Sequence, residues 1–286
     1  MKITKRFFKL NFPKIKKDSY KNINGKVLII AGSKTMQGAA VLNVLGAYSC
    51  GAGMVALASV PEVIKATVCT VPQALVLPLG KSPVNAIKKY IKSFKPDVLL
   101  IGSGLGEMAK NTLKILDFAK LPAVIDASSL TFLASKGAKL PKAGGPYILT
   151  PHVGEMERLL KQKTINTKTA ARELAQKTGA ICLLKGPVTY ISDGTKIYES
   201  HAGNCGLAKA GSGDVLGGII AALYARVLAQ TKEKTQGKKN AAFKAAALGC
   251  YLHGCAADFA AQETGETSLL ATDVIKKLPA AIKNLL

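Results

Sequence analysis

The chain contains the stretch Asn204-Cys205-Gly206-Leu207-Ala208-Lys209-Ala210-Gly211-Ser212-Gly213-Asp214-Val215-Leu216-Gly217-Gly218. Small residues lead up to Asp214, and an apolar run with helical spacing follows it. That run consists of Val215, Leu216, Ile219, Ile220, Ala222 and Leu223. We therefore expect a helix whose N-terminus lies at, or directly after, the segment from Gly211 to Asp214.

The expected helix start is a candidate phosphate site. The first amides of a helix have no partner within the helix, and the helix dipole places partial positive charge there. Gly211 and Gly213, which flank Ser212, would let a phosphate approach those amides closely. Asp214 is unusual in such a place because a carboxylate repels a phosphate. It is either a helix cap or a general base that takes a proton from an attacking hydroxyl, and this stretch alone leaves both roles open.

Composition narrows the class of protein. The 286 residues are 48% hydrophobic, which is enough for a sizeable core. The net charge is +23, but the lysines are spread along the chain and form no arginine-rich arm. We therefore expect small anionic substrates and no nucleic-acid partner.

The distribution of cysteines and of apolar residues predicts a cytoplasmic protein. Six scattered cysteines form no Cys-x-x-Cys pair, which indicates reduced, buried thiols and no zinc site. No apolar run is long enough to predict a membrane span, so we expect no membrane partner.

The order of the expected elements predicts a doubly wound α/β fold, with a mostly parallel central sheet and helices on both faces. We predict a basic N-terminal arm over residues 1–24, which packs through Phe7, Phe8, Leu10 and Phe12. Residues 25–286 are predicted to form a single domain. Near the C-terminus we expect a charged linker over 232–240, a helix over 241–262 and a last helix over 271–285 that Pro279 interrupts.

Several expected strands end in glycine or a polar residue. These residues are Gly32, Gly104, Asp126, His152 and Lys185. In an open α/β sheet the carboxyl ends of the strands share one edge, where ligands bind. Thr150 is expected to cap the following helix, with Pro151 in its first position and His152 in its first turn. A single histidine can be purely structural, and this sequence pattern also leaves that alternative open.

These motifs resemble the ADP/ATP-dependent NAD(P)H-hydrate dehydratase family, a branch of the ribokinase-like fold. The resemblance runs in order from Lys26 over nearly the whole chain. Its most specific elements are Thr150-Pro151-His152-Val153-Gly154-Glu155, Lys185-Gly186 and Gly211-Ser212-Gly213-Asp214. Weaker matches are Gly32-Ser33, Gly38-Ala39, Gly51-Ala52-Gly53, Gly102-Ser103-Gly104-Leu105-Gly106, Asp126-Ala127 and Tyr251-Leu252-His253-Gly254.

The resemblance implies an ADP-dependent dehydration of (6S)-hydrated NADH and NADPH, which gives back the reduced nucleotide with AMP and phosphate. It implies ADP, or ATP, as phosphoryl donor, Mg2+, and a homo-oligomer, a tetramer. The hydrated nucleotide would contact Ala39, Gly104, His152 and Asp214, with Asp214 as catalytic base and no protein ligand to a metal. The donor would contact Lys185, Gly186, Pro187, Val188, Thr189, Gly211, Ser212 and Gly213.

The chain departs from the family pattern in a few places. Family members commonly have proline where Cys205 stands, Thr or Ser followed by Gly where Lys209 and Ala210 stand, and an acidic residue where Ser128 stands. Lys209 could add a phosphate contact. We also expect no fused epimerase domain, because about two dozen residues precede the first expected strand.

Two other functions remain open at the level of sequence. A ribokinase-like kinase of a small alcohol or vitamin precursor would keep the same base and glycine amides but would release a stable phosphoester. A basic nucleic-acid-binding protein that has lost catalysis is a more distant alternative.

Overall fold

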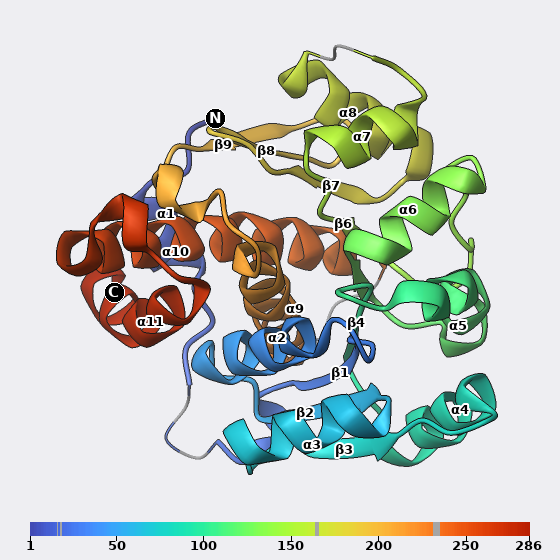
Figure 1. Cartoon of the computed structure of the whole chain (residues 1–286). Helices are drawn as coiled ribbons and strands as arrows, with labels where there is room; N and C mark the ends of the chain where they lie inside the picture. Colours follow the sequence, from blue (N-terminus) through green and yellow to red (C-terminus); the bar gives the residue numbers. More distant parts are fainter. Residues whose placement is uncertain (16, 18, 164–165, 231–234) are drawn as a thin grey trace.

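The chain folds around one nine-stranded sheet. The computed structural model describes residues 1–15, 17, 19–163, 166–230 and 235–286. The strand order is β3-β2-β1-β4-β5-β6-β7-β8-β9 (Figure 1). The strands are β1 Lys26–Ile30, β2 Met54–Ser59, β3 Leu75–Pro78, β4 Val98–Ile101, β5 Ala123–Ile125, β6 Tyr147–Leu149, β7 Ile181–Leu184, β8 Thr189–Ser192 and β9 Ile197–Ser200.

Strands β1 to β7 are parallel, and β8 and β9 form the antiparallel hairpin that follows. The longer helices are α1 Lys5–Asn11, α2 Gln37–Ser49, α3 Pro61–Thr70, α4 Pro83–Phe94, α5 Thr112–Ala119, α6 Ala127–Ser135, α7 Val153–Leu160, α8 Thr167–Thr178, α9 Ser212–Gln230, α10 Thr235–Ser268 and α11 Ala271–Leu285. Three short 3-10 helices are η1 Lys21–Ile23, η2 Gly106–Asn111 and η3 Cys205–Leu207. The predicted fold class is confirmed.

The sheet has a hydrophobic core on each face. Along β1, Val27 and Ile29 belong to one core, whereas Leu28 and Ile30 belong to the other. Helices α2, α9, α10 and α11 contribute to the first core, and α4 to α8 contribute to the second. This alternation follows from the two-residue period of a strand and explains why both sets of positions are apolar.

The chain changes direction across the sheet between β1 and β4. It winds from β1 to β3 on one side and then continues from β4 to β7 on the other. Just beyond the carboxyl ends of these two strands, the Gly32 N–H donates to the Ser103 carbonyl at 2.7 Å. This is the topological switch point, where open α/β sheets bind their ligands.

Helix α9 is held against α2 with almost no space between the backbones. A Cβ atom at Gly218 would lie 2.2 Å from the Asn43 carbonyl oxygen, and one at Gly46 would lie 2.7 Å from the Val215 oxygen. Among the described residues, α9 is the one helix with a length and composition that would suit a membrane span, and 78% of that window is buried inside the protein. Most of the apolar surface of α9 is therefore buried in the protein core.

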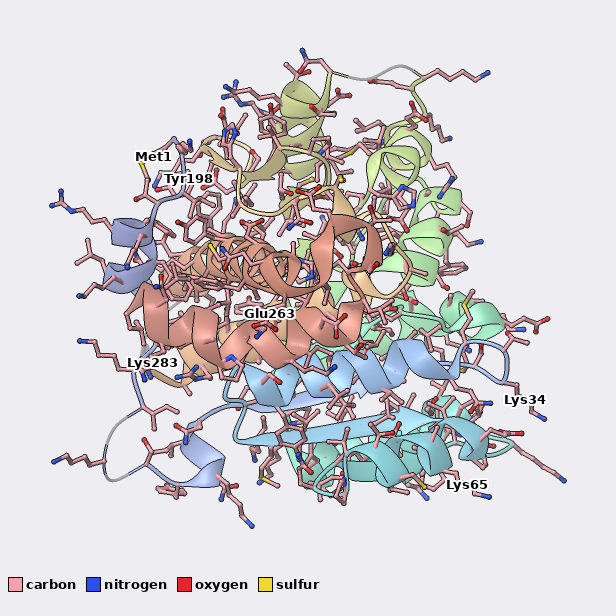
Figure 2. All side chains as sticks on the ribbon, turned by 60° about the vertical axis from the view of Figure 1, so that its left-hand side comes forward. Met1, Lys34, Lys65, Tyr198, Glu263 and Lys283 are labelled. Carbon is pink, nitrogen blue, oxygen red and sulfur yellow. The ribbon has the colours of Figure 1, made fainter. Side chains whose placement is uncertain are left out.

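The N-terminal arm packs onto the domain, although not through all the residues expected. Phe8 and Phe12 are buried, but Leu10 is 74% exposed because it lies on the outer side of α1. The buried Arg226 guanidinium lies over the Phe12 ring and donates to the Pro13 carbonyl. Figure 2 shows Met1 near Tyr198 of β9, and the Ile3 N–H donates to the Glu199 carbonyl.

The C-terminal helices are longer than expected. Helix α10 already begins at Thr235, so the predicted charged linker is wrong for 235–240, which includes the good helix formers Gln236, Lys238 and Lys239. Residues 232–234 of that linker lie outside the described part. Pro279 does not interrupt α11, whose buried side chains on both sides of the proline hold the helix together.

The contact between α2 and α9 yields a stability prediction. Gly218→Ala should lower the free energy of unfolding by at least about 2 kcal/mol, because the backbone of α2 must move to admit the methyl group. Gly38→Ala is the matched control: it lies in the first turn of α2 with nothing within 4 Å of the new atom, so stability should stay equal or rise. Urea denaturation measures both. Equal stability of Gly218→Ala and wild type would contradict this description of the helix contact.

Candidate functional site

The first turn of α9 lies at the switch point. Gly211 precedes the helix with a φ of +94°, a conformation that L side chains rarely adopt. Asp214 is the third residue of α9 and therefore does not occupy the cap position. The Asn43 amide of α2 donates to the Asp214 main-chain oxygen at 2.6 Å and fixes this turn.

Asp214 has the electrostatic character of a general base. Burial raises its pKa to about 6, and the negative charge of Asp126 adds to the rise, whereas Ser103 and Lys185 oppose it. The helix dipole alone predicts an easily ionised carboxylate, but the low polarity of the surroundings dominates. A carboxyl with a pKa near 6 is largely ionised at neutral pH and still binds a proton readily.

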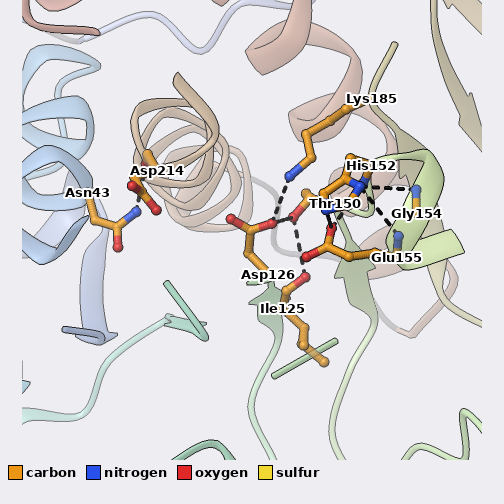
Figure 3. A network of polar contacts seen from close by, with 9 residues as sticks. All are labelled: Asn43, Ile125, Asp126, Thr150, His152, Gly154, Glu155, Lys185 and Asp214. Carbon is orange, nitrogen blue, oxygen red and sulfur yellow. Dashed lines mark hydrogen bonds and ion pairs between the residues drawn. The ribbon is translucent and has the colours of Figure 1, made fainter. Parts of the chain in front are cut away.

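A buried network lies beside Asp214 (Figure 3). The Lys185 ammonium is 3.0 Å from Asp126 Oδ1, and the Thr150 hydroxyl donates to the same oxygen at 2.7 Å. The Asp126 side chain is 3% exposed and that of Lys185 is 22% exposed. Asp126 follows β5, Thr150 follows β6 and Lys185 follows β7, so the sheet edge assembles this network.

Lys185 remains a cation in this setting. Burial alone would lower its pKa, but the charges of Asp126, Glu155 and Asp214 together outweigh burial and raise the pKa. Its nitrogen lies 3.5 Å from the position that a Cβ atom would take at Gly213. Lys185 therefore places a positive charge directly beside the amides of α9, in the position suited to an anionic ligand.

The helix after β6 begins two residues later than expected, and Thr150 does not cap it. The Lys185 N–H donates to the Pro151 carbonyl, so sheet pairing continues past β6 and delays the helix. His152 is the cap: its Nδ1 accepts from the Gly154 and Glu155 N–H groups. When His152 is neutral, its proton must therefore be on Nε2, which can donate to a ligand.

The other candidate residues form two groups near the switch point. Ala39 and Gly104 touch, because a Cβ at Gly104 would lie 3.0 Å from that of Ala39. Gly186, Pro187 and Val188 lie between β7 and β8, and Thr189 is the first residue of β8. Gly186 and Pro187 are exposed, and Val188 and Thr189 are half-buried. One group of candidates thus lies where α2 meets the loop after β4, and the other lies in the exposed loop after Lys185.

Two departures from the family pattern, Cys205 and Lys209, lie in the segment before α9. The Lys209 ammonium binds the carbonyls of Thr267 and Leu269, the latter at 3.0 Å, so in this structure it holds the end of α10. Cys205 and Cys69 are exposed, so the prediction of buried thiols is wrong for them. A carboxylate that sequence reasoning missed, Asp258, accepts from Gly203 and Asn204 and orders the loop before α9.

The fold and this edge of the sheet define the class of protein. A helix N-terminus free to bind phosphate, an adjacent buried cation and a base-like carboxyl meet at the switch point of a doubly wound sheet. The class is therefore a doubly wound α/β protein with a candidate anion-binding site at the switch point of its sheet.

Comparisons with known proteins identify the family. The family model described as NAD(P)H-hydrate dehydratase matches residues 27–280. The ADP-dependent (S)-NAD(P)H-hydrate dehydratase of Neisseria meningitidis serogroup B is 34% identical over 281 residues, which cover 93% of this chain and 88% of that protein. The chain belongs to the NAD(P)H-hydrate dehydratase family, and the prediction made from the motifs is confirmed.

Two further relatives agree with this assignment. The structure of the ADP/ATP-dependent NAD(P)H-hydrate dehydratase from Bacillus subtilis, co-crystallised with ATP/Mg2+, has a TM-score of 0.83 at 28% identity and covers 99% of this chain and 98% of that one. The bifunctional NAD(P)H-hydrate repair enzyme Nnr of Moorella thermoacetica is 34% identical over 299 residues, 99% of this chain and 54% of that protein. The chain spans about half the length of such bifunctional relatives.

The ion pair of the site yields a second stability prediction. Lys185→Met should lower the free energy of unfolding by about 3 kcal/mol, because it leaves the buried Asp126 carboxylate without its cation. Adding Asp126→Asn should recover most of the loss, since a neutral amide needs no counter-charge. Denaturant titration is the measurement.

The control for this prediction is an exposed ion pair of the same type. Lys34 and Glu62 lie 3.2 Å apart on the surface with side chains 76% and 42% exposed, so Lys34→Met should leave stability essentially unchanged. A loss in the double variant as large as in Lys185→Met would show that the missing charge partner is not the cause.

Proposed function

We propose that this protein catalyses the ADP-dependent dehydration of (6S)-hydrated NADH and NADPH to the reduced nucleotides, with release of AMP and phosphate. The observation that carries the proposal is the Asp214 carboxyl, with a pKa near 6, in the first turn of α9 beside Lys185. Family membership supports the choice of substrate, and the N. meningitidis relative is named as an ADP-dependent enzyme.

The chemistry follows from the arrangement of charges. Asp214 accepts the proton of the ring hydroxyl as the hydroxyl oxygen bonds to the terminal phosphorus of ADP and the bond to AMP breaks. The amides of Gly211 to Gly213 and the Lys185 ammonium stabilise the transferring phosphoryl group. Cleavage of the carbon–oxygen bond then expels phosphate, and loss of a proton from the neighbouring ring carbon restores the double bond.

The two ligands would bind to different groups of residues at the switch point. We place the nucleotide phosphates over Lys185, Gly186 and the loop to Thr189, where exposed backbone is accessible. The hydrated nicotinamide would lie between Ala39, Gly104 and Asp214, with His152 donating from Nε2. In each case the support is the position of the residue at the same edge of the sheet.

The donor set fits a Mg2+ ion that arrives with the nucleotide. The described residues contain no cluster of three metal-binding side chains, and Mg2+ is commonly held by substrate phosphates with one or two carboxylates. Of the three carboxyls whose charges act on Lys185, Asp126 and Asp214 could do so, whereas Glu155 accepts a hydrogen bond from the His152 N–H. When bound, the ion would neutralise phosphate charge.

The net charge of +23 supports anionic small-molecule substrates, because a positive surface attracts them over distance. We propose a cytoplasmic enzyme without a nucleic-acid or membrane partner. Its tetrameric state and the division into an arm, residues 1–24, and a single domain, residues 25–286, stay predictions.

The pKa of Asp214 predicts the acid side of the pH profile. The active base is the ionised form, so kcat/KM should fall about tenfold per pH unit below pH 6 in a stopped or coupled assay. Asp126→Asn should move this fall to lower pH, because the charge of Asp126 helps to raise the pKa. An unchanged position in that variant would contradict the proposed coupling.

Asp214→Asn tests the proposed function directly. The change removes the proton acceptor but keeps the size of the side chain, so turnover of hydrated NADH with ADP should fall at least about a hundredfold. A carboxyl whose pKa is raised on folding stabilises the protein only at acid pH, and this stabilisation is lost as the pH rises through about 6. The melting temperature at neutral pH should therefore stay equal or rise.

The same assay distinguishes a dehydratase from a kinase of a small alcohol. Hydrated NADH and either ADP or ATP should restore the absorbance of reduced nicotinamide, whereas a kinase of a small alcohol would leave a stable phosphoester. Near-normal turnover by Asp214→Asn would remove the base from the mechanism.

A further inference from the structure

The first turn of α9 lacks the side-chain cap that commonly holds the start of a helix. Gly211 precedes the helix and has no side chain that could accept from the free amides. In the described part of the chain, the Val215 N–H donates to the Gly211 carbonyl at 3.1 Å, whereas the Gly213 and Asp214 N–H groups donate to no other residue. Two amides are thus available to an anion, and the turn must be held in another way.

Helix α2 holds this turn from the side of its carbonyl groups. The Asn43 side-chain nitrogen donates to the Asp214 main-chain oxygen at 2.6 Å, across 171 positions of sequence (Figure 3). The preceding residue, Leu42, lies against the other end of the turn, because a Cβ atom at Gly211 would lie 2.7 Å from Leu42 Cδ1. Two consecutive residues of α2 therefore contact both ends of the turn.

Close packing fixes the Asn43 side chain. Asn43 is 0% exposed and is the one polar residue among the buried positions of α2. A Cβ atom at Gly217 would lie 3.4 Å from its side-chain nitrogen, and one at Gly218 would lie 2.2 Å from its main-chain oxygen. The reversed amide would place two oxygens against each other, so the nitrogen is the atom that faces Asp214.

The stability of the core does not explain an asparagine at this position. The second polar atom of the side chain, Oδ1, is buried and has no hydrogen-bond partner within the described residues. An unpaired buried oxygen destabilises a fold by at least as much as the single bond of the nitrogen stabilises it. A leucine has a similar shape and would avoid this loss, so a function of Asn43 in the site is the better explanation.

We propose that Asn43 is a positioning residue that takes the place of a helix cap. It orders the first turn of α9 through the Asp214 main-chain oxygen, so that the amides of Gly213 and Asp214 stay free to bind a phosphate and the Asp214 carboxyl has a fixed position. A Ser, Thr or Asp cap would occupy the amides that a phosphate needs. The proposal rests on the proposed function only in naming ADP as the phosphate ligand and Asp214 as the base.

The test compares two neighbouring substitutions in α2. Asn43→Leu removes the donor together with the unpaired oxygen at similar size. Val44→Ala is the matched control, because it truncates the next buried residue of the same helix and leaves the hydrogen bond intact. The full chain is used for three measurements: the melting temperature, the exchange rate of the Val215 N–H by NMR, and the Kd of ADP with Mg2+ by calorimetry.

For Asn43→Leu we expect an equal or higher melting temperature and about fivefold faster exchange of the Val215 N–H, which is the value of a typical hydrogen bond. The Kd for ADP should rise about fivefold, since a turn binds in proportion to the time it is ordered. A displaced base should lower kcat at least about tenfold. The KM for hydrated NADH should stay within about twofold, because Ala39 and Gly104 are unchanged. Val44→Ala should melt at lower temperature with near-normal exchange, Kd and kcat.

A lower melting temperature of Asn43→Leu with unaltered exchange and Kd would show that Asn43 only fills the core, and would overturn the proposal. Asn43→Ala removes the same donor by shortening the side chain, so a normal exchange rate of Val215 in this variant would overturn it equally. Wild-type protein that does not dehydrate hydrated NADH would contradict the proposed function. The exchange rate of Val215 would still decide the role of Asn43, because its measurement needs no substrate.

Discussion

The close packing of α9 on α2 is the constraint on which the site depends. Glycine at 46 and 218 allows two backbones to touch, which sets the depth of α9 below the surface and brings its first turn to the ends of β1 and β4. Larger residues at either position would move the first turn of α9 away from Lys185, whose nitrogen lies 3.5 Å from the position that a Cβ atom would take at Gly213. The geometry of the site is therefore a consequence of helix packing in the core.

The second organising feature is a cluster of three carboxyls and one amine whose bonding partners differ. Asp126 pairs with Lys185 and accepts a hydrogen bond from Thr150, and Glu155 accepts one from the N–H of His152. Within the described part of the chain, Asp214 forms no ion pair. Because like charges share a poorly hydrated space, the proton affinity of Asp214 rises while Lys185 stays charged. One cluster thus contains both a charged amine and a carboxyl with raised proton affinity.

The sequence predicted which strands and helices form the site more accurately than it predicted the residues at which they begin. Asp126 and Lys185 directly follow strands β5 and β7, as expected, because apolar runs bounded by turn residues leave little choice. The helix after β6 was misplaced because Thr-Pro is a typical helix start, and only the hydrogen bond from Lys185 to Pro151 decides that the extended chain continues. The role of Asp258 could not be predicted either, since its partners, Gly203 and Asn204, are more than 50 residues away in sequence.

The sequence by itself determined the fold class, the family, and the identity of the groups at the carboxyl edge, because strand and helix periodicity and the glycine-rich turns are local properties. Tertiary structure decided how those groups act. It buried Asp214 enough to reverse the effect expected from the helix dipole, it paired Lys185 with Asp126 from another strand, and it turned Lys209 toward the end of α10. Proton affinity and charge pairing depend on what surrounds a side chain in space, and residues distant in sequence provide those surroundings.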